Sequence, residues 1–191
     1  EKYLLCASPE RYIKKQGISI ISQPIKGTIK RDLQDSKLDN QNKTELQNSQ
    51  KDKSENVMVV DLVRNDLSKI STEGSVKVEE LFGIYSFPQV HQMISTITGE
   101  LKPLIGLNEI LDATFPMGSM TGAPKKKVMQ LIEEYEQSNR GIYSGCVGYI
   151  NPQKDFDFNV VIRSIMYNEI NQYLSYQVGG GITFYSWLKM I

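Results

Sequence analysis

The stretch SQPIKGTIKR, residues 22–31, contains a lysine whose neighbours make a chemical role worth weighing. Lys26 stands between Pro24 and Gly27, where an extended segment runs into a tight turn. Most lysines are solvated surface charges. A lysine amine that is held in a pocket and kept neutral is instead a nucleophile. The local sequence alone leaves both interpretations of Lys26 open.

Arg163 lies in a strongly apolar run, between Val160 and Ile165. A buried cation needs a partner, because desolvating it alone costs several kcal/mol. An ion pair with a carboxylate such as Asp157 would meet that need. A guanidinium is also well shaped to bind a ligand carboxylate through two parallel hydrogen bonds. The spacing by itself slightly favours the structural ion pair.

Two glycine-bearing segments are candidate anion sites. Glycines 179–181 separate two strand-like runs, and glycine weakens a strand unless the backbone must approach something closely. The N–H groups of such a turn can bind an anion, and a hairpin turn without a ligand is an equal alternative. The segment GSMTGAP, 118–124, brings Ser119 and Thr121 to the start of a helix, where anions are favoured. Simple capping of the helix is the preferred interpretation there.

Three further polar features have ordinary structural explanations. His91 is the only histidine, and on an apolar stretch a hydrogen-bonded core residue is commoner than a catalyst. Glu55 precedes an apolar helical run, where a first-turn carboxylate favours the helix dipole. Lysines 125–127 are typical of a solvated face. Each signal is weak when taken alone.

The elements that must position these residues form a mixed pattern. Short apolar runs bounded by turn residues predict strands, and the last third of the chain is typical of an antiparallel sheet. The expected strands are 2–8, 18–25, 76–82, the second half of 90–101 with a turn at Gly99, 143–150, 156–168 and 173–178. In 156–168, alternation places Arg163 on the same face as Asp157. Helices and strands mixed in this way predict an α+β fold.

Three helices are expected. Apolar residues at helical spacing predict a helix over 54–70 with Ser54 as its N-cap, and a short helix over 106–115. Pro124 suits the first turn of a third helix that Gly141 would end. Its expected buried stripe is Val128, Met129, Leu131, Ile132 and Tyr135. Residues 32–53 are polar and are interpreted as a surface excursion, a flexible loop rather than a helix.

Composition excludes several classes of protein. Lys plus Arg and Asp plus Glu are 22 each among 191 residues, so no overall field favours nucleic acid or a membrane surface. No apolar run has the length of a membrane-spanning helix, and no signal peptide opens the chain. Cys6 and Cys146 are expected to be reduced thiols in a cytoplasmic protein. The start at Glu1 indicates a piece of a longer protein.

Taken in order, the segments resemble the chorismate-utilising enzymes, which have the anthranilate-synthase-like fold of antiparallel β-sheets flanked by helices. The resemblance covers nearly the whole chain and implies a partial chorismate-binding catalytic domain over 1–191, with 32–53 as an excursion within it. The matching segments are SPER (8–11), PIKGT (24–28), ENVMVVDLVRNDL (55–67), GSMTGAPK (118–125), GIYSGCVGYI (141–150), DFNVVIRS (157–164) and QVGGGITF (177–184).

Within that family, Lys26 is the discriminating residue, since anthranilate, isochorismate and salicylate synthases typically have alanine there. The sequence most resembles aminodeoxychorismate synthase component I of the folate pathway. That resemblance implies conversion of chorismate and ammonia, supplied by a glutamine amidotransferase partner, to 4-amino-4-deoxychorismate. Lys26 would attack the ring, and Glu10 would be the acid that helps the C4 hydroxyl leave. The interval of 16 residues between them fits two adjacent strands of one sheet.

The resemblance also assigns the remaining site residues. It gives one chorismate carboxylate to Mg²⁺, a hard cation suited to oxygen ligands, with Glu55 as one metal-binding glutamate. It gives the other carboxylate to Tyr143, Arg163 and the backbone of Gly179 and Gly181. His91 and Ser119 match polar positions that lie near the reacting ring in the family. Thr121 is in the same turn as Ser119 and is assigned to substrate binding.

The chain also departs from the family pattern. The family continues after GGGITFYS into a helix with further metal-binding glutamates and a substrate-binding lysine, whereas here no acidic residue follows Glu169. The amino-terminal part of the family fold is missing as well. A catalytically inactive remnant or chorismate-binding module is therefore one alternative to an active transferase. A relative that forms anthranilate or isochorismate is the other.

Overall fold

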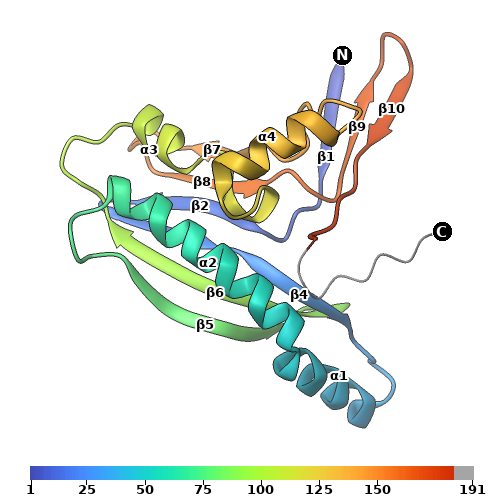
Figure 1. Cartoon of the computed structure of the whole chain (residues 1–191). Helices are drawn as coiled ribbons and strands as arrows, with labels where there is room; N and C mark the ends of the chain where they lie inside the picture. The colour runs from blue at the N-terminus through green and yellow to red at the C-terminus, as the bar shows by residue number, and fades with distance from the viewer. Residues whose placement is uncertain (183–191) are drawn as a thin grey trace.

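The computed structural model describes residues 1–182 and shows an α+β fold, as the sequence predicts. Every strand pairing is antiparallel, and the strands form one sheet of seven and one of three. The large sheet contains β2 (Arg11–Gln16), β3 (Ser19–Gln23), β4 (Ile25–Lys30), β5 (Lys77–Ser86), β6 (Val90–Glu100), β7 (Cys146–Ile150) and β8 (Phe156–Val160). The small sheet contains β1 (Lys2–Cys6), β9 (Ser164–Asn168) and β10 (Tyr173–Tyr176), and it projects from the body in Figure 1.

Strand β6 organises the large sheet. Strands β3 and β4 pair with it one after the other, from Ser19 opposite Glu100 to Lys30 opposite Val90, with Pro24 between the two strands. Strand β5 also pairs with β6, and β2 pairs with β3. The strand β6 extends over the whole predicted segment rather than its second half, and Gly99 lies inside it instead of in a turn.

Helix α2 (Gln50–Ile70) lies along the large sheet and closes the core, as Figure 1 shows. Its buried residues include Val59, Leu67 and Ile70, in agreement with the predicted helical periodicity. Leu67 and Ile70 pack in one core with Ile13, Ile20, Ile97 and Val160 from the strands beneath. Burial of this apolar face is the main term that holds the helix on the sheet.

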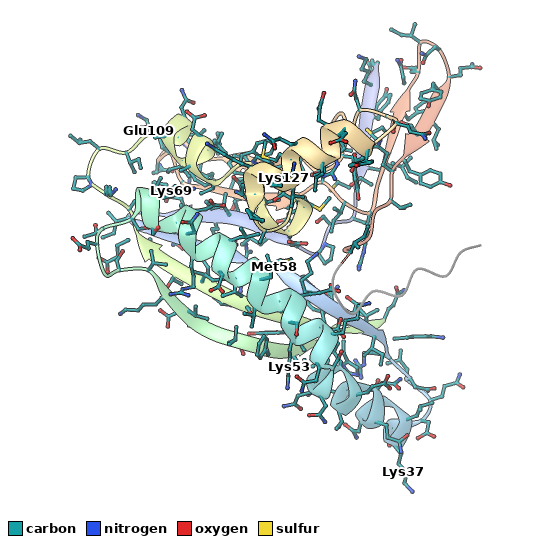
Figure 2. The ribbon with its side chains drawn as sticks, in the orientation of Figure 1. Lys37, Lys53, Met58, Lys69, Glu109 and Lys127 are labelled. Carbon is teal, nitrogen blue, oxygen red and sulfur yellow. The ribbon has the colours of Figure 1, made fainter. Side chains whose placement is uncertain are left out.

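The predicted start of that helix is wrong. Ser49, not Ser54, is the N-cap, and its hydroxyl accepts a hydrogen bond from the N–H of Asp52 at 3.2 Å. The polar segment 32–53 is also helical rather than a loop, since it contains α1 (Ser36–Asn48) with Asp35 as its N-cap. The polar composition reflects exposure, because only Leu46 of α1 is buried. Figure 2 shows side chains extending outward around α1, with Lys37 at its far end.

The predicted strand 156–168 is divided between the two sheets. Strand β8 ends at Val160, β9 begins at Ser164, and Arg163 between them has a positive φ of 50°. A non-glycine residue in the left-handed region interrupts an extended strand. The two segments therefore pair with different partners, β8 with β2 and β7, and β9 with β1 and β10.

Helix α3 (Leu107–Thr114) confirms the short predicted helix, and a 3₁₀ turn, η1 (Gly118–Met120), leads to α4 (Lys125–Tyr135). Helix α4 ends well before Gly141, with Glu136 as its C-cap. The predicted buried stripe of α4 is wrong, since no residue of α4 is fully buried and Tyr135 is 71% exposed. Val128, Leu131 and Ile132 are half-buried, whereas Met129 is exposed.

The cysteines and the lengths of the helices can be read from the structure. Cys6 and Cys146 are unpaired, as expected for reduced thiols. Within residues 1–182, no helix has both the length and the apolar character needed to cross a membrane.

Candidate active site

Lys26 lies on a β-bulge. Between the pairs Ile25–Ile94 and Thr28–Gln92, β4 has one more residue than β6, so Lys26 and Gly27 share the extra position. Gly27 has a φ of +98°, and a Cβ there would lie 2.9 Å from Leu46 Cδ1. A bulge redirects a side chain out of the regular alternation of the strand. The Lys26 amine is thereby aimed at η1, where it donates to the carbonyl oxygen of Ser119 at 3.2 Å.

Glu10 lies immediately before β2, where Arg11 pairs with Gln23 of β3. The predicted pair of adjacent strands is not observed, since β2 pairs with β3 and not with β4. Glu10 and Lys26 belong to neighbouring parts of one sheet because β3 continues along β6 into β4. Glu10 is 5% exposed, and burial raises the pKa of its carboxyl group. The Ser119 side chain, the Lys26 charge, the Ile25 N–H and the Arg163 charge oppose that pKa shift. A buried carboxyl group that favours its protonated form is suited to act as an acid.

The turn η1 brings Ser119 between these two groups. Its carbonyl oxygen accepts from Lys26, and its side chain acts on Glu10. Thr121 lies at the end of the turn, where its hydroxyl donates to the carbonyl oxygen of Met117 at 3.1 Å. The GSMTGAP segment therefore delivers Ser119 to the site, while the Thr121 hydroxyl holds the turn together.

The glycine segment runs close to Tyr143 and Glu55. A Cβ added at Gly179 would lie 2.8 Å from the Tyr143 hydroxyl oxygen, closer than real contacts allow. A Cβ added at Gly181 would lie 3.6 Å from Oε2 of Glu55. Burial raises the pKa of the Tyr143 hydroxyl, so it remains a neutral hydrogen-bonding group. Glycine at position 179 is explained by this close approach to Tyr143.

Arg163 is exposed, so the expectation of a buried cation is wrong. Asp157 is paired instead with Arg11, whose Nε lies 2.9 Å from its Oδ1. Within the described residues Arg163 forms no ion pair, and its charge acts on Glu10. Arg163 has a left-handed backbone conformation at the junction of the two sheets. It therefore does not share a strand face with Asp157, although the sequence predicts that it does.

His91 is almost completely buried, at 1% exposure, and both ring nitrogens have partners. Its Nδ1 lies 2.8 Å from the hydroxyl of Ser86, and its Nε2 lies 3.0 Å from Oδ1 of Asp39 on α1. On β6 it pairs with Ile29, three residues along β4 from Lys26. The ring is thus fixed near the bulge, and its hydrogen bonds are made within the protein.

The described residues do not complete a magnesium site. Glu55 has the right chemistry, but Mg²⁺ is octahedral and needs several oxygen ligands. No group of three or more His, Cys, Asp or Glu side chains is placed to hold a metal within residues 1–182. The predicted absence of the family's later glutamates concerns the segment after Tyr185, which lies outside the described residues. Magnesium binding therefore stays a prediction, and no chemical step below depends on it.

A small cavity of about 20 Å³ lies beside Glu10 and Ser119. It has room for about one water molecule and is too small for a cyclic dicarboxylate. Its polar lining also includes Tyr12, Ser22, Asp66 and Thr114. The space can hydrate Glu10 from the core side, away from the exposed glycine segment.

Sequence reasoning missed two groups that hold η1 and the turn before β7 in place. Lys125, predicted to be solvated, instead donates to the buried carboxylate of Asp66. Arg140 donates to the carbonyl oxygen of Met120 at 2.7 Å and to the Ser144 hydroxyl at 3.2 Å. Both are ordinary charged residues in polar segments, and no local pattern distinguishes them from surface charges.

Comparison with solved structures places this architecture among chorismate enzymes. Anthranilate synthase component I from Streptococcus pneumoniae superposes with a TM-score of 0.75 at 32% identity, covering 86% of this chain and 36% of that one. The sequence model for chorismate binding enzymes matches residues 1–189, so the chain belongs to the chorismate binding enzyme family. The resemblance in the sequence is confirmed.

Among curated relatives, aminodeoxychorismate synthase component 1 from Salmonella typhimurium is 42% identical over 94% of this chain and 39% of its own length. Anthranilate synthase component 1 from Saccharolobus solfataricus is 39% identical over 96% of this chain and 43% of its own length. The chain thus spans about two fifths of these relatives. Overall identity differs little between the two activities, so the site residues must distinguish them.

Proposed function

We propose that this chain carries the lysine-dependent site of an aminodeoxychorismate synthase component I, which converts chorismate and ammonia to 4-amino-4-deoxychorismate for the synthesis of para-aminobenzoate and folate. The observation that carries the proposal is the pairing of Lys26 with Glu10. A primary amine on a bulge and a buried carboxyl group with a raised pKa lie on either side of Ser119. The relatives with the highest identities quoted above include an enzyme of that name.

The chemistry requires a nucleophile and an acid at one site. The Lys26 amine forms a bond to C2 of chorismate while the ring double bond shifts and the C4–O bond breaks. Glu10 gives its proton to the departing oxygen, which leaves as water. The lysine nitrogen keeps both of its hydrogens and becomes a positively charged secondary ammonium, which is a good leaving group for the second step. Two easier displacements then replace one difficult substitution at C4.

In the second step ammonia attacks C4 and forms the new C–N bond. The double bond shifts back, the C2–N bond to Lys26 breaks, and the lysine amine is regenerated. The proton released from the attacking ammonia restores the charge balance through Glu10, which returns to its acid form. The neutral carboxyl group that burial favours is therefore both the starting and the final state of Glu10.

The substrate carboxylates need separate partners. Tyr143, Arg163 and the backbone near Gly179 are suited to one of them, since the glycine segment approaches Tyr143 closely and Arg163 is exposed. Glu55 beside Gly181 is the carboxylate that would contribute to Mg²⁺ at the other. The resemblance supports these assignments, and the further oxygen ligands must come from outside the described residues.

The ammonia source in this proposal is a glutamine amidotransferase subunit, since the Salmonella typhimurium relative is named as a first component. A cytoplasmic location is also part of the proposal. It is supported by the unpaired thiols of Cys6 and Cys146, which are typical of a reducing compartment.

A second enzymatic function deserves a test, because the Saccharolobus solfataricus relative is an anthranilate synthase at nearly the same identity. An isochorismate-forming relative is a third possibility of the same kind. Lys26 argues against both of these functions, since anthranilate and isochorismate synthases typically have alanine at the matching position. A chorismate-binding module without turnover is the non-enzymatic alternative.

The deciding experiment incubates the chain with chorismate, Mg²⁺ and a high ammonium concentration and identifies products by mass spectrometry. We expect 4-amino-4-deoxychorismate from the wild type and none from Lys26→Ala. Anthranilate or isochorismate as the product would replace the proposal. Binding is measured separately by calorimetry, so binding without product indicates the non-catalytic module. Absence of both binding and product contradicts a chorismate site in this chain.

A further inference from the structure

Four polar side chains from four segments form a continuous chain beside the Lys26 bulge. Arg31, which follows β4, lies 2.9 Å from Oδ2 of Asp39 through its Nη2. Asp39 Oδ1 lies 3.0 Å from Nε2 of His91 on β6. His91 Nδ1 lies 2.8 Å from the hydroxyl of Ser86, which ends β5. The backbone N–H of Asp32 also donates to Asp39 Oδ1, at 3.0 Å.

The contacts of Asp39 fix its chemical state. Hydrogen bonds from Arg31 lower the pKa of the Asp39 carboxyl group to about 2, and the N–H of Asp32 and the ring of His91 act in the same direction. The group is therefore a carboxylate at neutral pH. A carboxylate can only accept hydrogen bonds, so the Nε2 that faces it must carry a proton.

A neutral imidazole has one N–H, and the partner of one ring nitrogen determines the state of the other. With the proton on Nε2, the Nδ1 of His91 has a free lone pair. Ser86 can then donate its hydroxyl hydrogen to Nδ1. His91 is 1% exposed, so water does not compete for these two hydrogen bonds of its ring.

We propose that Asp39 is a positioning residue that holds His91 in its Nε2–H tautomer, leaving Nδ1 as the hydrogen-bond acceptor for the hydroxyl of Ser86 on β5. Arg31 holds Asp39 in turn. The assignment of this tautomer does not depend on the proposed function.

The tautomer can be measured without turnover. His91 is the only histidine in the sequence, so a ¹⁵N-histidine-labelled chain gives the ring signals of this residue alone. Long-range ¹H–¹⁵N spectra at about pH 8.5, well above the ordinary imidazole pKa of about 6.5, report which nitrogen lacks a proton. We expect unprotonated Nδ1 and protonated Nε2 in the wild type. A protonated Nδ1 would overturn the proposal.

Two variants separate positioning from general structural support. Asp39→Ala removes the acceptor, and we expect the two ring signals to move together as the tautomers mix. Ser86→Ala is the matched control, because it removes the other ring partner and should leave Nε2 protonated. An unchanged tautomer in folded Asp39→Ala contradicts the assignment. If Asp39→Ala does not fold, the wild-type and Ser86→Ala spectra still decide it, and a failed chorismate assay leaves this result intact.

Discussion

The amine of Lys26 and the carbonyl oxygen of Ser119, 93 positions apart in the chain, lie 3.2 Å from one another. The same serine acts through its side chain on Glu10. One residue of a short 3₁₀ turn thus contacts both the proposed nucleophile and the proposed acid. The two groups are held at a shared site by η1 as well as by the sheet, and this arrangement defines the first two predictions.

Replacing Lys26 with methionine keeps an unbranched side chain but removes the amine. We expect chorismate-dependent product to disappear, because the first displacement has no nucleophile. Intact-mass analysis of wild type during turnover should show a ring-derived adduct at Lys26 that is absent from the variant. Full activity in Lys26→Met, together with an unmodified lysine in the wild type, would refute covalent catalysis.

Replacing Glu10 with glutamine should lower the turnover rate by about 10²–10⁴-fold, the usual contribution of a general acid. Burial raises the pKa of Glu10 above 4.5, so the wild-type carboxyl contributes most to folding stability below that pH and loses its contribution as the pH rises. We therefore expect urea unfolding to show Glu10→Gln at least as stable as wild type at pH 7. A strongly destabilised variant at that pH would contradict a buried, protonation-favouring carboxyl.

Gly179→Ala should displace Tyr143, because the new Cβ would lie 2.8 Å from its hydroxyl oxygen. Chorismate affinity should fall by about ten- to a hundredfold, or about 1–3 kcal/mol, while the melting temperature changes little. Gly180→Ala is the control, since nothing lies within 4 Å of a Cβ there. Equal affinities for the two variants in calorimetry would remove Gly179 from the proposed site.

Gly27→Ala should destabilise the fold by about 2 kcal/mol or more, since position 27 combines a positive φ with a close approach to Leu46 and Asp52. Gly17 also has a positive φ, but nothing lies within 4 Å of a Cβ there. Gly17→Ala should therefore cost only the conformational term, about 1 kcal/mol. Denaturant unfolding compares the two variants, and equal losses would mean that packing at the bulge is unimportant.

Arg31→Gln should weaken the pH dependence of the free energy of unfolding that comes from ionisation of Asp39. The hydrogen bonds to Asp39, with those from Arg31 the largest cause, lower the pKa of its carboxyl group from 3.8 to about 2. The stabilisation from Arg31 is therefore present above about pH 4 and is lost as the pH falls toward 2. We expect the variant to be less stable than wild type at pH 7, with the difference shrinking below pH 4. Arg64→Gln, which breaks an exposed pair with Asp61, should change little at either pH.

The α+β class and the elements with strong periodicity could be predicted because their signals are local. Helix α2 and strand β5 follow from local apolar patterns. The break at Arg163 could not be predicted in this way. Its neighbours are uniformly apolar, and the change from one sheet to the other is set by which strands β8 and β9 pair with.

Two other misses have a common cause, which is that burial depends on partners distant in sequence. The stripe of α4 has the right spacing for a core helix, yet none of its residues is fully buried and Met129 is 41% exposed. Helix α1 has only a weak apolar pattern and is fixed by its Asp35 cap and by the contacts of Asp39. For the site, residue types identified the candidates, but only the fold could reveal that Asp39 and Arg140 support them.

The extra residue at Lys26 and Gly27 separates the side chain at position 26 from the register of β4 with β6. Ile25 and Thr28 keep their pairs with β6 on the two sides of the bulge, so the backbone hydrogen bonds of the sheet do not depend on the side chain at position 26. A sheet built in this way can accept an exchange of lysine for a smaller residue while its pairing stays intact. Related enzymes could thus diverge in reaction type through one codon, with the architecture around it inherited unchanged.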